Sequence, residues 1–334
     1  MARSAAAAAA AAALLLLSVG AVAAFQPPPP PIPPPPFLVE ALVGYAANKG
    51  LQMVAPGTGN AHNATGLRYV HLPVSLLPAS FPRRAFVQVR DAAPVFNTLV
   101  DRISRDAYWL EASLGEAARS DDFTGRLLSM YMALHKEGPP AQPVALGLHR
   151  SDYMVDASSS SSSSGKEEEP RLLQVELNTI ASSFGCLAAG TAGLHYYLIS
   201  RYCRHGLSGP GQGRNLALDF LESYLAAHPG VVPPGAAPDE AMALEALRAL
   251  PVNPTLEALP EAIAAAHEYY GQGRAAVVFV VQPGERNLFD QRFLELALWK
   301  SHGVPVVRLT LEQVRCDAMR CDANRWSGWL SDLG

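Results

Sequence analysis

The stretch LLQVELNTIASSFG, residues 172–185, decides how the fold of this chain is interpreted. Apolar and polar residues alternate in its first half, as they do in a strand whose two faces differ. The apolar face is formed by Leu173, Val175 and Leu177, and the polar face by Gln174, Glu176 and Asn178. We therefore expect a strand that buries its apolar face and presents an acid and an amide on the other.

The second half of this stretch is small and polar. Thr179, Ser182, Ser183 and Gly185 can offer hydroxyl groups and backbone N–H groups to a ligand. The carboxylate and amide oxygens just before them are ligands that a hard cation prefers. The alternative is an edge strand with a solvated polar face, followed by a serine turn.

Composition places the chain among globular proteins. Its 334 residues are enough for two domains and a substantial core, with 49% hydrophobic and 17% charged residues. A net charge of −4 without a basic stripe gives no indication of nucleic-acid binding. The four cysteines, at 186, 203, 316 and 321, lack a zinc spacing and favour free thiols in a reducing compartment.

The amino terminus has the composition of a targeting segment. Arg3 precedes an alanine run, Leu14–Leu17 and further small residues, which is typical of a signal or transit segment over residues 1–24. A secretory signal, an organellar transit peptide, a membrane anchor and low-complexity alanine remain alternatives. Residues 25–36 are read as a polyproline linker, because proline lacks the N–H donor and fixes φ. No membrane association is expected once the amino-terminal segment is removed.

Periodicity and turn residues predict the elements that follow. We expect helices over 38–49, between 84 and 138, and over 191–203, 216–225, 240–250, 260–270 and 287–301. We expect strands over 144–148, or a longer 144–153 that pairs with 171–178, and at 275–281 and 304–309. Ala275–Val281 is a continuous apolar run, typical of a strand buried on both faces, and it opens a right-handed βαβ unit. Seven serines within residues 156–170 predict a disordered hairpin extension.

Five segments, in order, resemble motifs of eukaryotic-type glutathione synthetases. They are DDFTGRL (121–127), LHKEG (134–138), LGLHRSDYM (146–154), ELNTIASSFG (176–185) and ERNLFDQR (285–292). The resemblance covers about residues 38–310, with residues 204–250 as a family-divergent insert. It implies an α/β fold of the ATP-grasp type, with a helical and hairpin region over 37–271 and the start of a parallel-sheet substrate-binding domain over 272–334.

The resemblance also implies a reaction and a site. Glutathione synthetase ligates γ-glutamylcysteine to glycine with ATP and Mg²⁺, as a homodimer, in the cytoplasm or in a plastid or mitochondrion. Glu176 then corresponds to a contact of both ATP and magnesium, and Asn178 to a second magnesium ligand. The implied substrate contacts are Arg150, Ile180, Ala181, Ser182, Ser183, Glu285, Arg286, Asn287 and Gln291. No residue is assigned as catalytic.

The chain departs from the family pattern in two ways. Ala181 stands where the family commonly has serine, so one hydroxyl contact is lost. The family's later glycine-rich loop and ATP-binding lysines have no match, so we expect an incomplete ATP-grasp fold that is not active alone. The alternatives are a non-catalytic fragment or regulatory paralogue that binds γ-glutamylcysteine or a synthetase subunit, and an unrelated binding module with a Rossmann-like half.

Overall fold

The computed structural model describes residues 34–57, 66–79, 81–136, 138, 144–156, 171–204, 216–227 and 240–314. The predicted signal or transit segment, most of the polyproline linker, the serine run and the tail after residue 314 lie outside these ranges. In the described part, no helix combines the length and the apolar character needed to cross a membrane.

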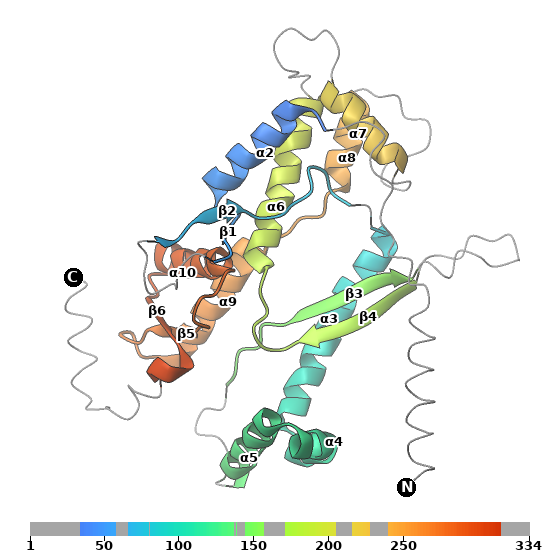
Figure 1. Ribbon diagram of the computed structural model, residues 1–334. Coiled ribbons are helices and arrows are strands. Elements are labelled where there is room, and N and C mark those ends of the chain that lie inside the picture. Colours follow the sequence, from blue (N-terminus) through green and yellow to red (C-terminus); the bar gives the residue numbers. More distant parts are fainter. Residues whose placement is uncertain are drawn as a thin grey trace, which may run out of the picture.

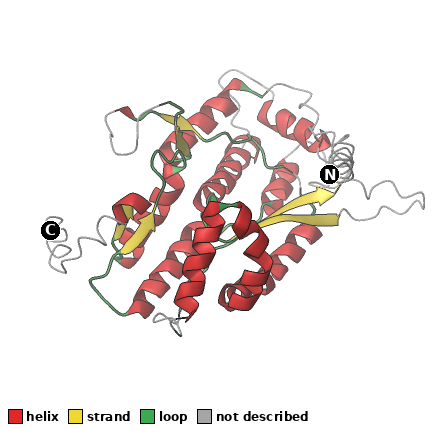
Figure 2. Cartoon of the chain, turned by 60° about the horizontal axis from the view of Figure 1, so that its bottom comes forward, coloured by secondary structure: helices red, strands yellow, loops and turns green. Residues whose placement is uncertain are grey.

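The largest core lies within a group of helices (Figures 1 and 2). Its elements are α2 (Pro36–Lys49), α6 (Gly185–Leu198), the π-helix η3 (Ile199–Arg204), α7 (Leu216–Ala227) and α8 (Glu240–Ala249). Leu38 and Leu42 of α2 pack with Leu194 and Leu198 of α6. Helices α7 and α8 belong to the predicted insert, and their buried residues show that the insert contributes to this core.

The predicted βαβ unit is confirmed. Strand β5 (Val277–Val280) pairs in parallel with β6 (Val306–Leu309), and α10 (Leu288–His302) connects them. Helix α9 (Thr255–Tyr270) precedes the unit and packs beside α10. The expectation that β5 is buried on both faces is wrong, because Val278 and Val280 are exposed. With one partner strand, one face of β5 packs on the small core around Ile263 and Leu298 and the other stays open.

The alternating stretch at residues 172–178 lies in one strand of a hairpin. Strand β3 (Arg150–Asp156) pairs antiparallel with β4 (Arg171–Asn178), from Arg150 opposite Asn178 to Asp156 opposite Arg171. The register shifts between Asp152 and Tyr153. The predicted strand at residues 144–148 is wrong, since no strand is assigned there and pairing begins only at Arg150. The apolar face of β4 is also not buried in the described part, since Val175 is 58% exposed.

Three further helices continue from a short hairpin of β1 (Gln52–Val54) and β2 (Tyr69–His71). They are α3 (Arg83–Arg105), α4 (Ala107–Ser120) and α5 (Asp122–Lys136), which appear in cyan and green in Figure 1. Asp121 caps α5, accepting from the backbone N–H of Thr124. Aromatic residues of these helices would most simply form core, but Tyr108 is 83% exposed and Phe123 is exposed as well.

Both cysteines in the described part are free thiols in the core. Cys186 begins α6 and Cys203 lies in η3, and both are buried. Burial raises the pKa of each thiol to about 12, with Asp290 adding to the effect at Cys186. These thiols therefore stay protonated at neutral pH and are poor nucleophiles.

Candidate functional site

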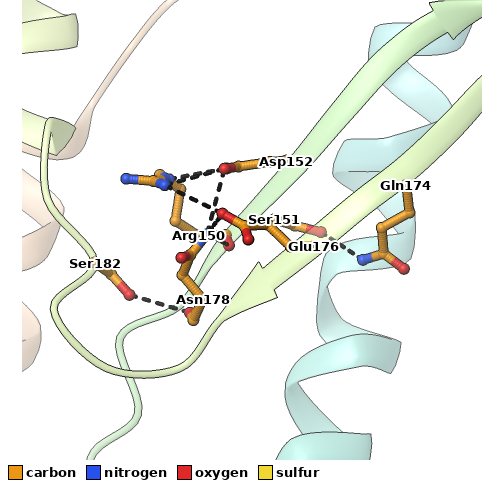
Figure 3. Close-up of polar contacts among 7 residues, drawn as sticks. All are labelled: Arg150, Ser151, Asp152, Gln174, Glu176, Asn178 and Ser182. Carbon is orange, nitrogen blue, oxygen red and sulfur yellow. Dashed lines mark hydrogen bonds and ion pairs between the residues drawn. The ribbon is translucent and has the colours of Figure 1, made fainter. Parts of the chain in front are cut away.

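Four predicted or neighbouring polar residues meet at the open end of the β3–β4 hairpin (Figure 3). Arg150 donates through Nε to Oδ1 of Asp152 at 2.8 Å and through Nη2 to Oδ2 at 3.0 Å. Its Nη2 also lies 3.8 Å from Oε1 of Glu176. The amide nitrogen of Asn178 donates to Glu176 Oε1 at 3.1 Å and to Asp152 Oδ2 at 3.3 Å. Antiparallel pairing of Arg150 with Asn178 and of Asp152 with Glu176 brings these side chains together.

Asp152 was not predicted from the sequence as a site residue, yet it is the bidentate hydrogen-bond partner of Arg150. The bidentate bond from Arg150 lowers the pKa of the Asp152 carboxyl, and the same bond raises the pKa of Arg150. The pair is therefore charged at neutral pH. Asp152 occupies two donors of the guanidinium, and no residue in the described ranges accepts from Nη1.

The oxygen atoms of the side chains at this end of the hairpin are of the kind that binds a magnesium ion. Mg²⁺ prefers oxygen ligands, and it commonly takes one or two from the protein and the others from water and phosphates. Glu176, Asp152 and the side-chain oxygen of Asn178 supply such ligands, provided that the Asn178 amide turns its oxygen toward the carboxylates. No cluster of three or more acidic, His or Cys side chains with metal-binding geometry occurs among the described residues.

The loop between β4 and α6 is held in an uncommon conformation. Ala181 and Phe184 have φ values of 53° and 73°, in the left-handed region that few residues other than glycine adopt. Ser182 donates from its hydroxyl to the carbonyl of Asn178 at 3.1 Å, which ties the loop back to the strand. Ile180 is exposed. Such strained residues persist where surrounding contacts fix them, and they cluster at ligand sites.

Asp290 of α10 supplies the contacts that fix this loop. Its carboxylate, in a residue that is 5% exposed, accepts from the backbone N–H of Phe184 at 2.7 Å. It also accepts from the N–H groups of Cys186 at 3.0 Å and Leu187 at 3.1 Å. These donors lie at the amino-terminal end of α6, where N–H groups lack helical partners and an anion is favourable. Asp290 lies inside the ERNLFDQR motif, but no local pattern indicates this long-range role.

The three predicted residues before α10 have separate environments. Glu285 accepts from the backbone N–H of Asn287 at 2.7 Å, and Arg286 donates to the carbonyl of Val54 at 3.2 Å. Asn287 occupies the N-cap position of α10 but makes no capping bond with its side chain. It is 8% exposed, and neither its Oδ1 nor its Nδ2 has a hydrogen-bond partner among the described residues. A buried amide without partners is costly, so this one is available for a ligand.

Gln291 is oriented by a residue that the sequence did not indicate. Its Oε1 accepts from Nη2 of Arg308 on β6 at 2.6 Å. Burial, with Arg292 nearby, lowers the pKa of the Arg308 guanidinium, whose Nη1 has no partner among the described residues. The signal in the sequence would have been a lone cation within the apolar strand Val306–Leu309.

The predicted site residues therefore form two groups. Arg150, Glu176 and Asn178 lie together on the hairpin, and Glu285, Asn287 and Gln291 lie at the start of α10. The loop with Ile180, Ala181, Ser182 and Ser183 connects them in the chain, and Asp290 fastens its carboxyl end to α10. Arg286, also predicted as a substrate contact, donates from Nε to the carbonyl of Val54 on β1.

Comparisons with known proteins show what this chain is similar to. Residues 36–303 match the family described as eukaryotic glutathione synthase, ATP binding domain. Chloroplastic glutathione synthetase of Solanum lycopersicum is 34% identical over 249 residues, which is 75% of this chain and 37% of that protein. Glutathione synthetase of Homo sapiens is 34% identical over 73% of this chain and 41% of that protein. The chain thus spans less than half the length of these relatives.

A solved structure shares the fold. It is a glutathione synthetase-like effector from Globodera pallida in its apo form, with a TM-score of 0.54 and 20% sequence identity. The match covers 85% of this chain and 52% of that one. At this identity the likeness supports the α/β fold alone.

Proposed function

The chain belongs to the eukaryotic glutathione synthase family, and from this premise we propose that it serves the ATP-dependent ligation of γ-glutamylcysteine to glycine. The match to an ATP-binding domain supports ATP as co-substrate. We further propose that the hairpin, the loop at residues 179–184 and the start of α10 together form the site for γ-glutamylcysteine.

The buried amide of Asn287 carries this proposal. It has a donor and an acceptor without partners, at a position where the ERNLFDQR segment was expected to contact substrate. A dipeptide offers amide groups and carboxylates that match both atoms. Gln291, oriented by Arg308, and the Nη1 donor of Arg150 add polar contacts. The strained loop supplies backbone N–H groups between them.

Magnesium is proposed as the metal of the reaction. Glu176 and Asn178 would hold it, with Asp152 close enough to contribute. When bound, the ion neutralises phosphate charge and so favours phosphoryl transfer. The side chains of the hairpin orient the phosphate end of ATP toward the substrate carboxylate, with Glu176 as the contact shared by ATP and metal.

Assembly and compartment are proposed from the family. A homodimer is the proposed state, and residues 1–24 are proposed as a transit segment for an organelle or, alternatively, a secretory signal. Both plant relatives that we compared are named as chloroplastic proteins, which supports a plastid for this chain. A cytoplasmic location remains the alternative.

We expect Arg150→Lys to weaken binding of γ-glutamylcysteine by roughly 5- to 150-fold, the effect of losing a charged hydrogen bond. Lysine keeps the charge but cannot bond Asp152 with two parallel donors while offering a third to the ligand. Isothermal titration of γ-glutamylcysteine into the purified chain measures this directly and does not require turnover.

Arg126→Lys provides the matched control. Arg126 on α5 is an exposed arginine with a distant ion pair, 3.9 Å from Asp122. Its substitution should leave the affinity unchanged. Equal affinities for wild type, Arg150→Lys and Arg126→Lys would remove Arg150 from the site.

A further inference from the structure

A ligand-sized cleft lies along α2, which runs beside α6 in Figure 1. Its volume is about 740 Å³, and residues of α2 line one side while Tyr197 at the end of α6 and Tyr202 of η3 line the other. We call it the α2 groove. Its lining residues are Phe37, Glu40, Ala41, Gly44, Tyr45, Asn48, Lys49, Tyr197 and Tyr202.

Four aromatic rings form a continuous row in the α2 groove. Tyr45 stacks on Tyr197 with ring centroids 5.2 Å apart, Tyr197 meets Tyr202 edge to face at 6.2 Å, and Tyr202 packs on Phe37 at 5.6 Å. The π-helix accounts for this row. Tyr197 and Tyr202 are five residues apart, so in an α-helix they would point about 140° apart. In a π-helix residues at this spacing are neighbours.

The floor of the α2 groove is kept open by Gly44. Glycine inside a helix is less favourable than alanine by about 1 kcal/mol in propensity. A Cβ built at Gly44 would have no atom within 4 Å, so no packing inside the described part requires a glycine there. The side of α2 that carries Gly44 is therefore free to receive a ligand between the aromatic residues.

The chemistry of the α2 groove suits a proline-rich segment. A polyproline helix offers rings and carbonyl acceptors but no N–H donors, and proteins bind it in grooves lined by aromatic rings. The α2 groove presents aromatic faces together with the donors of Asn48 and Lys49. Phe37 and Lys49 are twelve residues apart on α2, about 18 Å, which about six residues of polyproline helix would span.

We propose that the α2 groove binds the proline-rich segment QPPPPPIPPPP, residues 26–36, of a second copy of this chain. This segment runs directly into α2, and Pro35 is already buried against the body of the protein. Its prolines disfavour a turn back onto the helix that follows it. Pro33, Pro34 and Pro35 each precede a proline, and a residue before proline is driven away from the α-region backbone that tight turns use. A second copy can instead place its segment in the groove, and two copies can do so reciprocally.

The test uses the full chain and two variants that separate the groove from the segment. Gly44→Leu places a bulky side chain in the groove, at a position where a Cβ would meet no atom within 4 Å, and Gly44→Ala is its matched control. The segment variant replaces Pro28, Pro30 and Pro33 by serine. We expect the wild type and Gly44→Ala to dimerise in sedimentation equilibrium, and Gly44→Leu and the segment variant each to be folded but monomeric. A mixture of the two monomeric variants should form dimers, because one retains the segment and the other the groove.

A synthetic peptide of residues 26–36 gives an independent readout. It should bind the segment variant, dissociate wild-type dimers, and bind Gly44→Leu at least about tenfold more weakly. The peptide is uncharged, so its affinity should be nearly the same at low and high salt. The proposal would be overturned if the peptide did not bind or if the dimer survived Gly44→Leu. It would also be overturned if the mixed variants failed to associate, and that result would favour an intramolecular contact.

Discussion

Replacing Asp290 by alanine should lower the free energy of unfolding by about 3 kcal/mol, because the variant leaves three backbone donors without their common acceptor. The N–H groups of Phe184, Cys186 and Leu187 all donate to this carboxylate, and two of those bonds are buried. The carboxylate also places a negative charge at the amino-terminal end of α6, where the helix dipole favours it. Equilibrium unfolding in urea provides the measurement.

Asp290→Ala should affect the conformation of the loop as well as stability. Without Asp290, the N–H of Phe184 loses the acceptor that helps to hold its left-handed backbone, and the loop at residues 179–184 should relax. Binding of γ-glutamylcysteine should therefore also weaken.

Asp122→Ala is the matched control for Asp290→Ala. Asp122 lies in the first turn of α5, also an acid at a helix amino terminus, but its side chain is 98% exposed. Its removal should change stability by no more than about 0.5 kcal/mol. A similarly small change for Asp290→Ala would show that the loop is not fastened through this carboxylate.

Asn287→Leu should weaken ligand binding without lowering the stability of the fold. The substitution removes two buried polar atoms that lack partners, and no capping bond is lost, so we expect unfolding free energy to rise by about 1 kcal/mol or stay the same. Binding of γ-glutamylcysteine should fall at least about tenfold, since the ligand loses both a donor and an acceptor. Urea unfolding and calorimetric titration on the same preparation measure the two effects.

Asn97→Leu controls for the change of residue type. Asn97 is exposed on α3, away from the proposed site, and its substitution should leave both stability and affinity nearly unchanged. If Asn287→Leu bound γ-glutamylcysteine as tightly as wild type, the buried amide would have no role in binding. If the variant were instead strongly destabilised, the amide would have structural partners after all.

The sequence predicted the elements well where a local pattern was sufficient. Alternation in residues 172–178 predicted β4. The ranges expected for α2, α9 and α10 ended close to the observed ends, where Gly50, Gly271 and Gly303 each adopt a left-handed backbone. The parallel pairing of β5 with β6 followed from the βαβ pattern. These features depend on residues close together in the chain.

The features that were not predicted from the sequence depend on neighbours that are distant in the chain. Alternation cannot show what covers a strand, so the exposure of Val175 was not foreseen. The left-handed backbone at Ala181 and Phe184 is imposed by tertiary contacts, and neither residue type indicates it. Asp290 reaches donors about one hundred residues earlier in the chain, and its role appears only once α10 lies beside α6.

The central claim is that three segments distant in sequence form one site for γ-glutamylcysteine. Hydrogen exchange of the full chain with and without γ-glutamylcysteine tests it most directly, because amide protection reports each segment separately. We predict that the ligand slows exchange together in residues 150–153, 176–187 and 285–291, and leaves α3, α4 and α5 unchanged. Protection confined to one of the three segments, or no protection at a ligand concentration that saturates the calorimetric titration, would contradict the account.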